Sequence, residues 1–211
     1  MKKYQLTLLS LCVAAFAQAK VTLPSFFTDN MVIQQNSRLT LPGKAKAGKQ
    51  VTVKVSWNNE KYTTQAADGH FTIEVPTPSA GGPYQITVSD GEKLVLNNVL
   101  SGEVWICSGQ SNMEMPVAGW GKVMNYEQEV ADADYPSIRL LQVKKTVAFS
   151  PQENVEMNMN GWQECSSATV PEFSSVAYFY ARKLWKELNV PVGVIDCGVG
   201  PLPNRGQVIR H

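Results

Sequence analysis

Hydrophobic and polar residues alternate along the first half of the chain, from residue 20 to about residue 99. The clearest runs place an apolar side chain at every second position: Val51, Val53, Val55 and Trp57; Phe71, Ile73 and Val75; Tyr84, Ile86 and Val88. This period of two is typical of strands with one buried and one solvated face. Residues that favour turns separate the runs: Pro42-Gly43, Asn58-Asn59, Asp68-Gly69, Gly81-Gly82-Pro83 and Asp90-Gly91. The pattern predicts a small antiparallel β-sandwich of the jelly-roll kind over residues 20–99.

The pattern changes after Ser101. Residues 104–107 form a short apolar run, as in a strand buried on both faces, and residues 192–197 form a second one. Between them, residues 174–188 have helical periodicity, with an apolar side made of Val176, Phe179, Tyr180, Leu184 and Leu188. Ser174 or Ser175 can cap this helix, and Asn189 and Pro191 end it. A strand, a helix and a strand predict an α/β region with parallel pairing over residues 100–197, whereas residues 119–161 have no readable pattern.

The first 19 residues have the features of an export signal. Lys2 and Lys3 precede an apolar stretch that is too short to cross a bilayer, and Ala17-Gln18-Ala19 is a pattern that signal peptidase cuts. We do not expect Cys12 to be lipidated, because the bulky Leu11 before it does not suit the cleavage that precedes lipidation. We therefore expect an exported protein, periplasmic or secreted, and no later stretch is apolar enough to span a membrane.

Composition argues against a disordered, a collagen-like or an acidic-tailed protein. The chain of 211 residues is 44% hydrophobic and 18% charged, as in an ordinary globular protein. Its net charge of +1 becomes −1 without the two signal lysines, which gives no electrostatic reason to expect a nucleic-acid partner. The cysteines outside the signal are Cys107, Cys165 and Cys197, with no metal-binding spacing and with apolar or aromatic neighbours. Buried, unreactive thiols are the interpretation that this pattern favours.

Candidate chemistry follows the first apolar strand, in the run Ser108-Gly109-Gln110-Ser111-Asn112. Sites in open α/β sheets form beyond the carboxyl ends of the strands, where Ser111 lies. Gly109 permits a tight turn, which can expose the hydroxyl beside backbone N–H groups able to stabilise an oxyanion. A serine that only caps a helix is the alternative. The run is not the nucleophile elbow of α/β-hydrolases, because Met113 stands where that motif has glycine.

Residues 104–116, VWICSGQSNMEMP, resemble the nucleophile block of the sialate O-acetylesterase family of SGNH-type carbohydrate esterases. Residues 23–34 are similar to the opening of that family's β domain, residues 173–179 to its first long helix, and residues 190–196 to the next strand. The resemblance runs in order from Leu23 to Cys197. It implies the first part of an SGNH-hydrolase-like three-layer domain after the β domain.

The resemblance also implies hydrolysis of O-acetyl esters on sugars or glycans, without a metal or organic cofactor. Ser111 would be the nucleophile, and its N–H would contribute to the oxyanion hole. Gly109, Gln110 and Asn112 belong to the same block. In the family, a glycine after the second strand, for which Gly198 and Gly200 are candidates, and a later asparagine complete the hole. For Glu114, a solvated or loop-bracing role is as well supported by the sequence as a catalytic one. The acetylated sugar is not determined, since neither Arg139 nor Arg182 is placed by sequence against a sialate carboxylate.

The pattern breaks at the residues that would activate the serine. The family supplies an Asp-x-x-His late in a longer domain, whereas this chain has His70, in a turn of the β region, and His211, with Val208 three residues before it. Resemblance stops at residue 198, and residues 198–211 are interpreted as an aberrant tail from a frameshift or a premature end, with a short family member as the alternative. The functional alternative is an inactive fragment that acts as a glycan- or protein-binding β module. The two apolar strands also lack predicted neighbours, so we expect the α/β half to be poorly stable alone.

Overall fold

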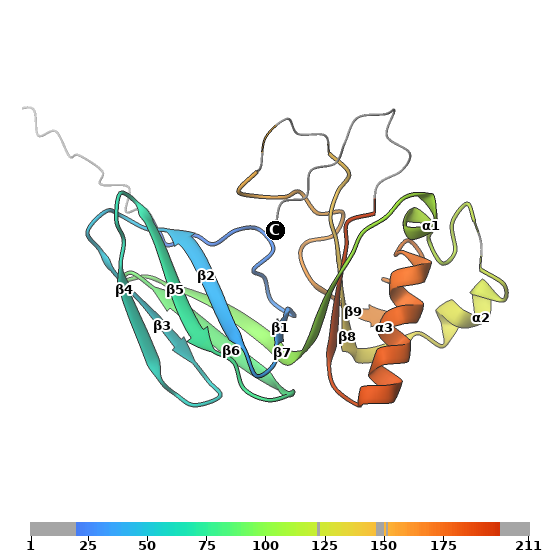
Figure 1. The fold of residues 1–211 in the computed structure, drawn as a ribbon, viewed down its shortest axis with the longest axis horizontal. Helices are drawn as coiled ribbons and strands as arrows, with labels where there is room; N and C mark the ends of the chain where they lie inside the picture. The colour runs from blue at the N-terminus through green and yellow to red at the C-terminus, as the bar shows by residue number, and fades with distance from the viewer. Residues whose placement is uncertain (1–19, 122, 147–149, 151, 199–211) are drawn as a thin grey trace, which may run out of the picture.

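A computed structural model describes residues 20–121, 123–146, 150 and 152–198. The predicted signal at residues 1–19 lies outside the described residues, as do Gly200 and the rest of the tail. The described chain is a mixed α/β fold. One eight-stranded mixed sheet has the order β4-β3-β6-β7-β10-β8-β9, with β1 beside β7, and β2 and β5 form a separate antiparallel pair (Figure 1).

The antiparallel half contains the predicted alternating strands. Its elements are β1 (Val32–Gln34), β2 (Arg38–Lys44), β3 (Gln50–Val55), β4 (Lys61–Gln65), β5 (His70–Pro76) and β6 (Gly81–Ser89). The apolar positions of β3 and β5 are buried, as the alternation predicts, and they pack in a core between the β2–β5 pair and the larger sheet. Turns at residues 58–59, 68–69 and 90–91 are confirmed, and Asn59, Asp68 and Gly91 all have positive φ.

Two predicted turns are wrong. Pro42 and Gly43 lie inside β2, paired with Thr72 and Phe71 of β5. A Cβ at Gly43 would meet the Phe71 ring at 2.4 Å, so this glycine makes room for an aromatic ring rather than for a turn. Residues 81–83 begin β6, where irregular pairing with β7 accommodates two glycines and a cis peptide bond.

β7 (Lys93–Cys107) joins the two halves as one strand of 15 residues. Its first part pairs with β6 and its last part pairs in parallel with β10 (Val192–Asp196), so the sheet continues across the predicted division at residue 99/100. The expected strand at 104–107 is therefore the end of a longer one. It is also not buried on both faces, because Trp105 is 42% exposed and Ile106 is 71% exposed.

The parallel half places β10 at its centre. β10 pairs in parallel with β7 on one edge and with β8 (Asp134–Gln142) on the other, and β9 (Gln163–Ser166) pairs antiparallel with β8. The predicted parallel pairing of β7 with β10 is thus confirmed, and β8 is a second neighbour of β10 that the sequence pattern did not predict. The helices of this half are α1 (Ser111–Glu114), α2 (Tyr126–Ala131) and α3 (Ser175–Leu188), and none in the described part of the chain could cross a membrane.

α3 packs on one face of the parallel strands (Figure 1). Its N-cap is Ser174, whose hydroxyl accepts from the N–H of Ala177, and it ends at Asn189 in the left-handed conformation. The expected apolar side is only partly right: Phe179 and Leu184 pack against the core, but Val176, Tyr180 and Leu188 are exposed. The buried positions of the helix are Ser175, Ala177, Tyr178 and Ala181. Small side chains on the buried face let α3 approach the sheet closely. A prediction of the buried face from the large apolar residues alone overlooks these positions.

Candidate active site

Ser111 begins α1, four residues after β7 ends at Cys107. The carbonyl of Gln110 accepts hydrogen bonds from the N–H groups of Met113 and Glu114, at 2.9 and 3.1 Å, which fixes the turn into α1. Ser111 is exposed, and its hydroxyl has no hydrogen-bond partner among the described residues. An exposed hydroxyl at the carboxyl end of a parallel strand is the arrangement that nucleophilic attack on a bound ester requires.

The residues predicted around Ser111 take different positions. Gln110 and Asn112 are exposed on either side of it, and Gly109 is half-buried before them. Gly109 does not have a positive φ. A Cβ there would lie 3.1 Å from the Cβ of Met113, so the glycine lets the loop lie closely over α1.

Three strands end side by side near this loop. The register places Cys107 of β7 beside Asp196 of β10, and Asp196 beside Gln142 of β8. Asp196 is only 4% exposed. Its Oδ2 accepts from the Gln142 amide at 3.1 Å, and its Oδ1 accepts from the Gly198 N–H at 2.9 Å. Sequence reasoning missed Asp196 because Gln142 lies 54 positions away from it.

Burial raises the pKa of Asp196, although the hydrogen bonds from Gly198 and Gln142 and the charge of Lys145 act to lower it. Because the Gly198 N–H donates to this carboxylate, it is engaged inside the loop rather than directed toward a substrate. Gly198 also packs against α1, since a Cβ there would meet the carbonyl carbon of Met113 at 3.2 Å. Asp196 thus connects the loop after β10 with the loop that carries Ser111.

Glu114 braces α1 through an ion pair with Lys145, on the segment after β8. Its side chain is 22% exposed and that of Lys145 is 49% exposed. The sequence left a catalytic, a solvated and a loop-bracing role open for Glu114. This ion pair supports the bracing role.

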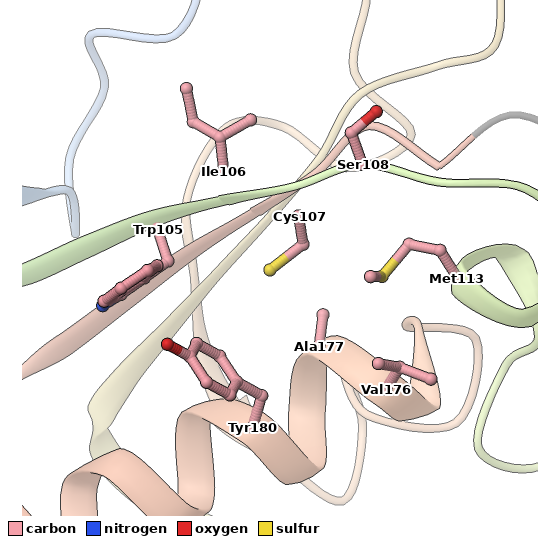
Figure 2. Close-up of a pocket in the computed structure, with 8 residues that line it drawn as sticks. All are labelled: Trp105, Ile106, Cys107, Ser108, Met113, Val176, Ala177 and Tyr180. Atoms are coloured by element: carbon pink, nitrogen blue, oxygen red, sulfur yellow. The ribbon is translucent and has the colours of Figure 1, made fainter.

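A hollow of about 270 Å³ lies between the end of β7 and α3. Figure 2 shows the residues that line it: Trp105, Ile106, Cys107, Ser108, Met113, Val176, Ala177 and Tyr180. The rings of Trp105 and Tyr180 meet edge to face, with centroids 5.3 Å apart. The lining is mostly apolar and does not include Ser111. The hollow therefore lies next to the candidate site and does not enclose the Ser111 hydroxyl.

A general base for Ser111 is not found among the described residues. His70 is exposed at the start of β5, in the antiparallel half, and its backbone pairs with Ala67. His211 and Val208 lie outside the described residues. Serine attack on esters normally needs a base within hydrogen-bond reach.

The two arginines are engaged elsewhere. Arg139 is 3% exposed and bonds with the carbonyls of Pro136, Asn30 and Asn98, and it forms an ion pair with Glu164. Arg182 pairs with Glu129 on α2 and lies over the rings of Tyr178 and Phe179. Neither one faces Ser111.

The three described cysteines are free thiols. Burial raises the pKa of Cys107 to about 11 and that of Cys165 to about 12. Cys197 is partly exposed, and its thiol donates to the carbonyl of Cys107 at 3.4 Å. Buried, protonated thiols at Cys107 and Cys165 match the unreactive role that the sequence indicated.

Comparison with known proteins gives the site its context. The sialate O-acetylesterase of Pongo abelii is 30% identical over 196 residues, which cover 85% of this chain and 37% of that protein. The enzyme of the same name from Rattus norvegicus is 28% identical, over 85% of this chain and 36% of the relative. The chain is a homologue of the sialate O-acetylesterases. It spans little more than a third of the length of these relatives.

A solved structure is also similar to this chain, across both of its halves. A carbohydrate acetylesterase from Xanthomonas citri superposes with a TM-score of 0.78 at 30% identity, covering 85% of this chain and 40% of that one. The likeness in fold thus extends over the two-part sheet. No family model matches the chain.

Proposed function

We propose that the protein is a carbohydrate O-acetylesterase of the sialate O-acetylesterase type, with Ser111 as its nucleophile. The observation that carries this proposal is the exposed hydroxyl of Ser111 at the carboxyl end of β7, which no residue that the structure describes engages in a hydrogen bond. Homology to sialate O-acetylesterases and a fold shared with a carbohydrate acetylesterase support it. The substrate class is an O-acetylated sugar or glycan.

The proposed reaction has two steps. The Ser111 oxygen attacks the acetyl carbonyl as its proton passes to a base, and the sugar alcohol leaves with a proton, which gives an acetyl-enzyme. Water then attacks the acetyl-enzyme, releasing acetate and restoring the hydroxyl. The N–H groups at the start of α1 would stabilise the oxyanion, with Gly200, which follows β10 in the sequence, as a further candidate donor, because the Gly198 N–H is engaged by Asp196. Gln110 and Asn112 would shape the pocket.

A chromogenic acetyl ester, p-nitrophenyl acetate, tests this proposal with the purified protein. We expect measurable turnover that Ser111→Ala reduces to the background rate, because alanine has no hydroxyl to carry the acetyl group. Ser167→Ala is the matched control, since Ser167 is exposed and lies just after β9. Equal activity in Ser111→Ala and the wild type would remove Ser111 from the mechanism.

The alternative is a module that binds a glycan or another protein without catalysis. The observation that favours it is that the described residues place no base beside Ser111. The two proposals separate in the same assay: folded protein that does not hydrolyse the ester, but is retained on an immobilised acetylated glycan, is a binding module.

Export and the finer domain assignment belong to the same proposal. We propose cleavage after Ala19, a jelly-roll-like β domain over residues 20–99 and the first part of an SGNH-type three-layer domain over residues 100–197. The apolar segment before Ala17-Gln18-Ala19 supports export. Amino-terminal sequencing of the exported protein should begin at Lys20.

A further inference from the structure

The helix that begins with Ser111 is too short to fix its own position. α1 has four residues, and none of them is buried. A single helical turn is not stable by itself, because forming it fixes several residues in return for one or two hydrogen bonds. The direction of the Ser111 hydroxyl therefore depends on what the rest of the chain places against this turn.

Gly198 provides one such contact. It is buried, and a Cβ at this position would lie 3.2 Å from the carbonyl carbon of Met113 and 3.2 Å from its Cγ. Since this leaves little room for a side chain, the backbone of the loop after β10 lies directly against α1. A side chain two residues earlier holds Gly198 there, because the Gly198 N–H donates to the Asp196 Oδ1 at 2.9 Å.

The Asp196 carboxylate is itself held from its other side. Its Oδ2 accepts from the Gln142 nitrogen at 3.1 Å, and the same nitrogen donates to the carbonyl of Glu172 at 3.2 Å. The Gln142 oxygen accepts from Asn158 at 3.0 Å, so both ends of the amide group are engaged. The carboxylate therefore has a defined orientation, and the Gly198 N–H follows it.

The proposed reaction gives this buried carboxylate no role. Removing a carboxylate from water costs free energy, yet Asp196 is only 4% exposed, beside the end of β7. An aspartate can also serve only to close a turn by accepting from the N–H two residues later. The contact of Gly198 with Met113 argues for more than that, because a turn that serves β10 alone need not lie against α1.

We propose that Asp196 is a positioning residue for Ser111: through the Gly198 N–H it holds the loop after β10 against α1 and so fixes the direction of the Ser111 hydroxyl. The catalytic consequence rests on the proposed esterase function, whereas the effect on the order of α1 does not. The role requires an oxygen that accepts from Gly198, and it does not require a negative charge.

Asparagine should therefore replace Asp196 in this role, because it retains such an oxygen, and the Gln142 nitrogen still has the Glu172 carbonyl as its acceptor. Leucine has a similar branched shape but no acceptor, so it should not. Circular dichroism checks that both variants fold. Asp196→Ala, which removes the acceptor without adding bulk, takes the place of Asp196→Leu if the leucine variant does not fold.

Hydrogen exchange followed by mass spectrometry tests the effect on α1 in the full chain, whether or not the chain hydrolyses esters. The probes are the hydrogen-bonded amide groups of Met113, Glu114 and Met115. In Asp196→Leu they should exchange about tenfold faster than in the wild type, the factor expected for one buried hydrogen bond, and in Asp196→Asn they should stay within about threefold. Residues 70–76, in β5, are the internal reference and should not change.

Hydrolysis of p-nitrophenyl acetate gives the second readout. Asp196→Leu should lower kcat by about tenfold or more with little change in KM, because a misdirected hydroxyl impairs attack rather than binding. Asp196→Asn should retain most of the rate. Asp134→Leu is the control, since Asp134 is exposed at the start of β8, and it should change neither readout.

Unchanged exchange at α1 in Asp196→Leu overturns the proposal, and so does equally fast exchange in the leucine and asparagine variants. A rise over residues 70–76 as large as that at α1 also overturns it, because Asp196 then supports the whole fold. So does a Ser111-dependent rate that Asp196→Leu leaves unchanged. If exchange changes as expected but Ser111→Ala hydrolyses the ester as fast as the wild type, the effect on α1 stands and the proposed function fails.

Discussion

Asp196 introduces a carboxylate into the centre of the parallel half, where it is 4% exposed beneath the loop that carries Ser111. Burial raises its pKa, so the folded protein retains this proton to higher pH than the unfolded chain does. The group therefore favours the folded state at acid pH, and this contribution is lost as pH rises through its folded pKa. Asp196 is thus a pH-dependent element beside the candidate site.

Asp196→Asn should make stability less sensitive to pH. Asparagine stays uncharged and retains an oxygen that can accept from the Gly198 N–H. We expect the unfolding free energy of the variant minus that of the wild type to increase from about pH 4 to about pH 7. Urea unfolding at both pH values measures it, with the exposed Asp68→Asn as control. A difference that falls with pH would mean that the hydrogen bonds of the carboxylate outweigh its burial.

Single residues were predictable from the sequence when their role depends on near neighbours. Ser111 lies directly after the strand that precedes it in the chain, and Ser174 caps the helix that follows it. Asp196 and Arg139 were not predictable, because their partners come from distant segments: Arg139 bonds with Asn30, 109 positions away. Nothing in the local pattern around either residue indicates such a partner.

At the scale of elements, the two helix-capping candidates Ser174 and Ser175 differ sharply. Both are almost fully buried. The Ser174 hydroxyl accepts from the Ala177 N–H at 3.3 Å and donates to the Met113 sulfur at 3.4 Å. The Ser175 hydroxyl has no hydrogen-bond partner in the part of the chain that the structure describes. The sequence predicted the boundary of α3 but could not decide between the two, because that depends on which side chain faces the first turn.

Ser174→Ala should destabilise the protein by about 1 kcal/mol, because it removes the N-cap of α3. Ser175→Ala is the matched control, one residue away and equally buried. It should leave stability unchanged or raise it slightly, since it removes a buried hydroxyl without a partner. Thermal unfolding of both variants against the wild type measures the contrast. Equal losses would show that packing, rather than capping, determines stability at this turn.

The length of β7 shows what pattern alone misses among elements. The change of rhythm near residue 100 correctly marks a change from antiparallel to parallel pairing, yet the strand does not stop there. Periodicity reports which faces are buried, not whether the backbone continues. The sequence pattern also did not predict β8. Its proline and its buried arginine interrupt the apolar run that indicates a central strand.

At the scale of the whole molecule, the two halves share a core. Trp162 and Leu141 from the parallel half pack with the strands of the antiparallel half. The indole N–H of Trp162 also donates to the carbonyl of Phe26 at 3.1 Å, and its backbone N–H donates to the Thr28 hydroxyl. Such contacts favour cooperative unfolding of both halves, which modifies the expectation of a poorly stable α/β half, because that half does not stand alone in the structure.

Arg139 is a buried polar connection between the halves, and its replacement provides a test of this cooperativity. Its guanidinium bonds with Asn30 and Asn98 of the antiparallel half while its ion pair partner, Glu164, lies in the parallel half. Arg139→Met leaves buried carbonyls without donors, and we expect a loss of about 3 kcal/mol.

Arg38→Met is the control for Arg139→Met, because the Arg38–Glu74 pair is exposed, with a separation of 3.6 Å, and should contribute less than about 1 kcal/mol. Urea unfolding followed by circular dichroism and by tryptophan fluorescence measures both variants. The wild type should show one transition by both probes, and Arg139→Met should shift it to lower urea far more than Arg38→Met does. If the two variants unfold alike, the halves are held together by the apolar core that contains Trp162, and the buried guanidinium adds little.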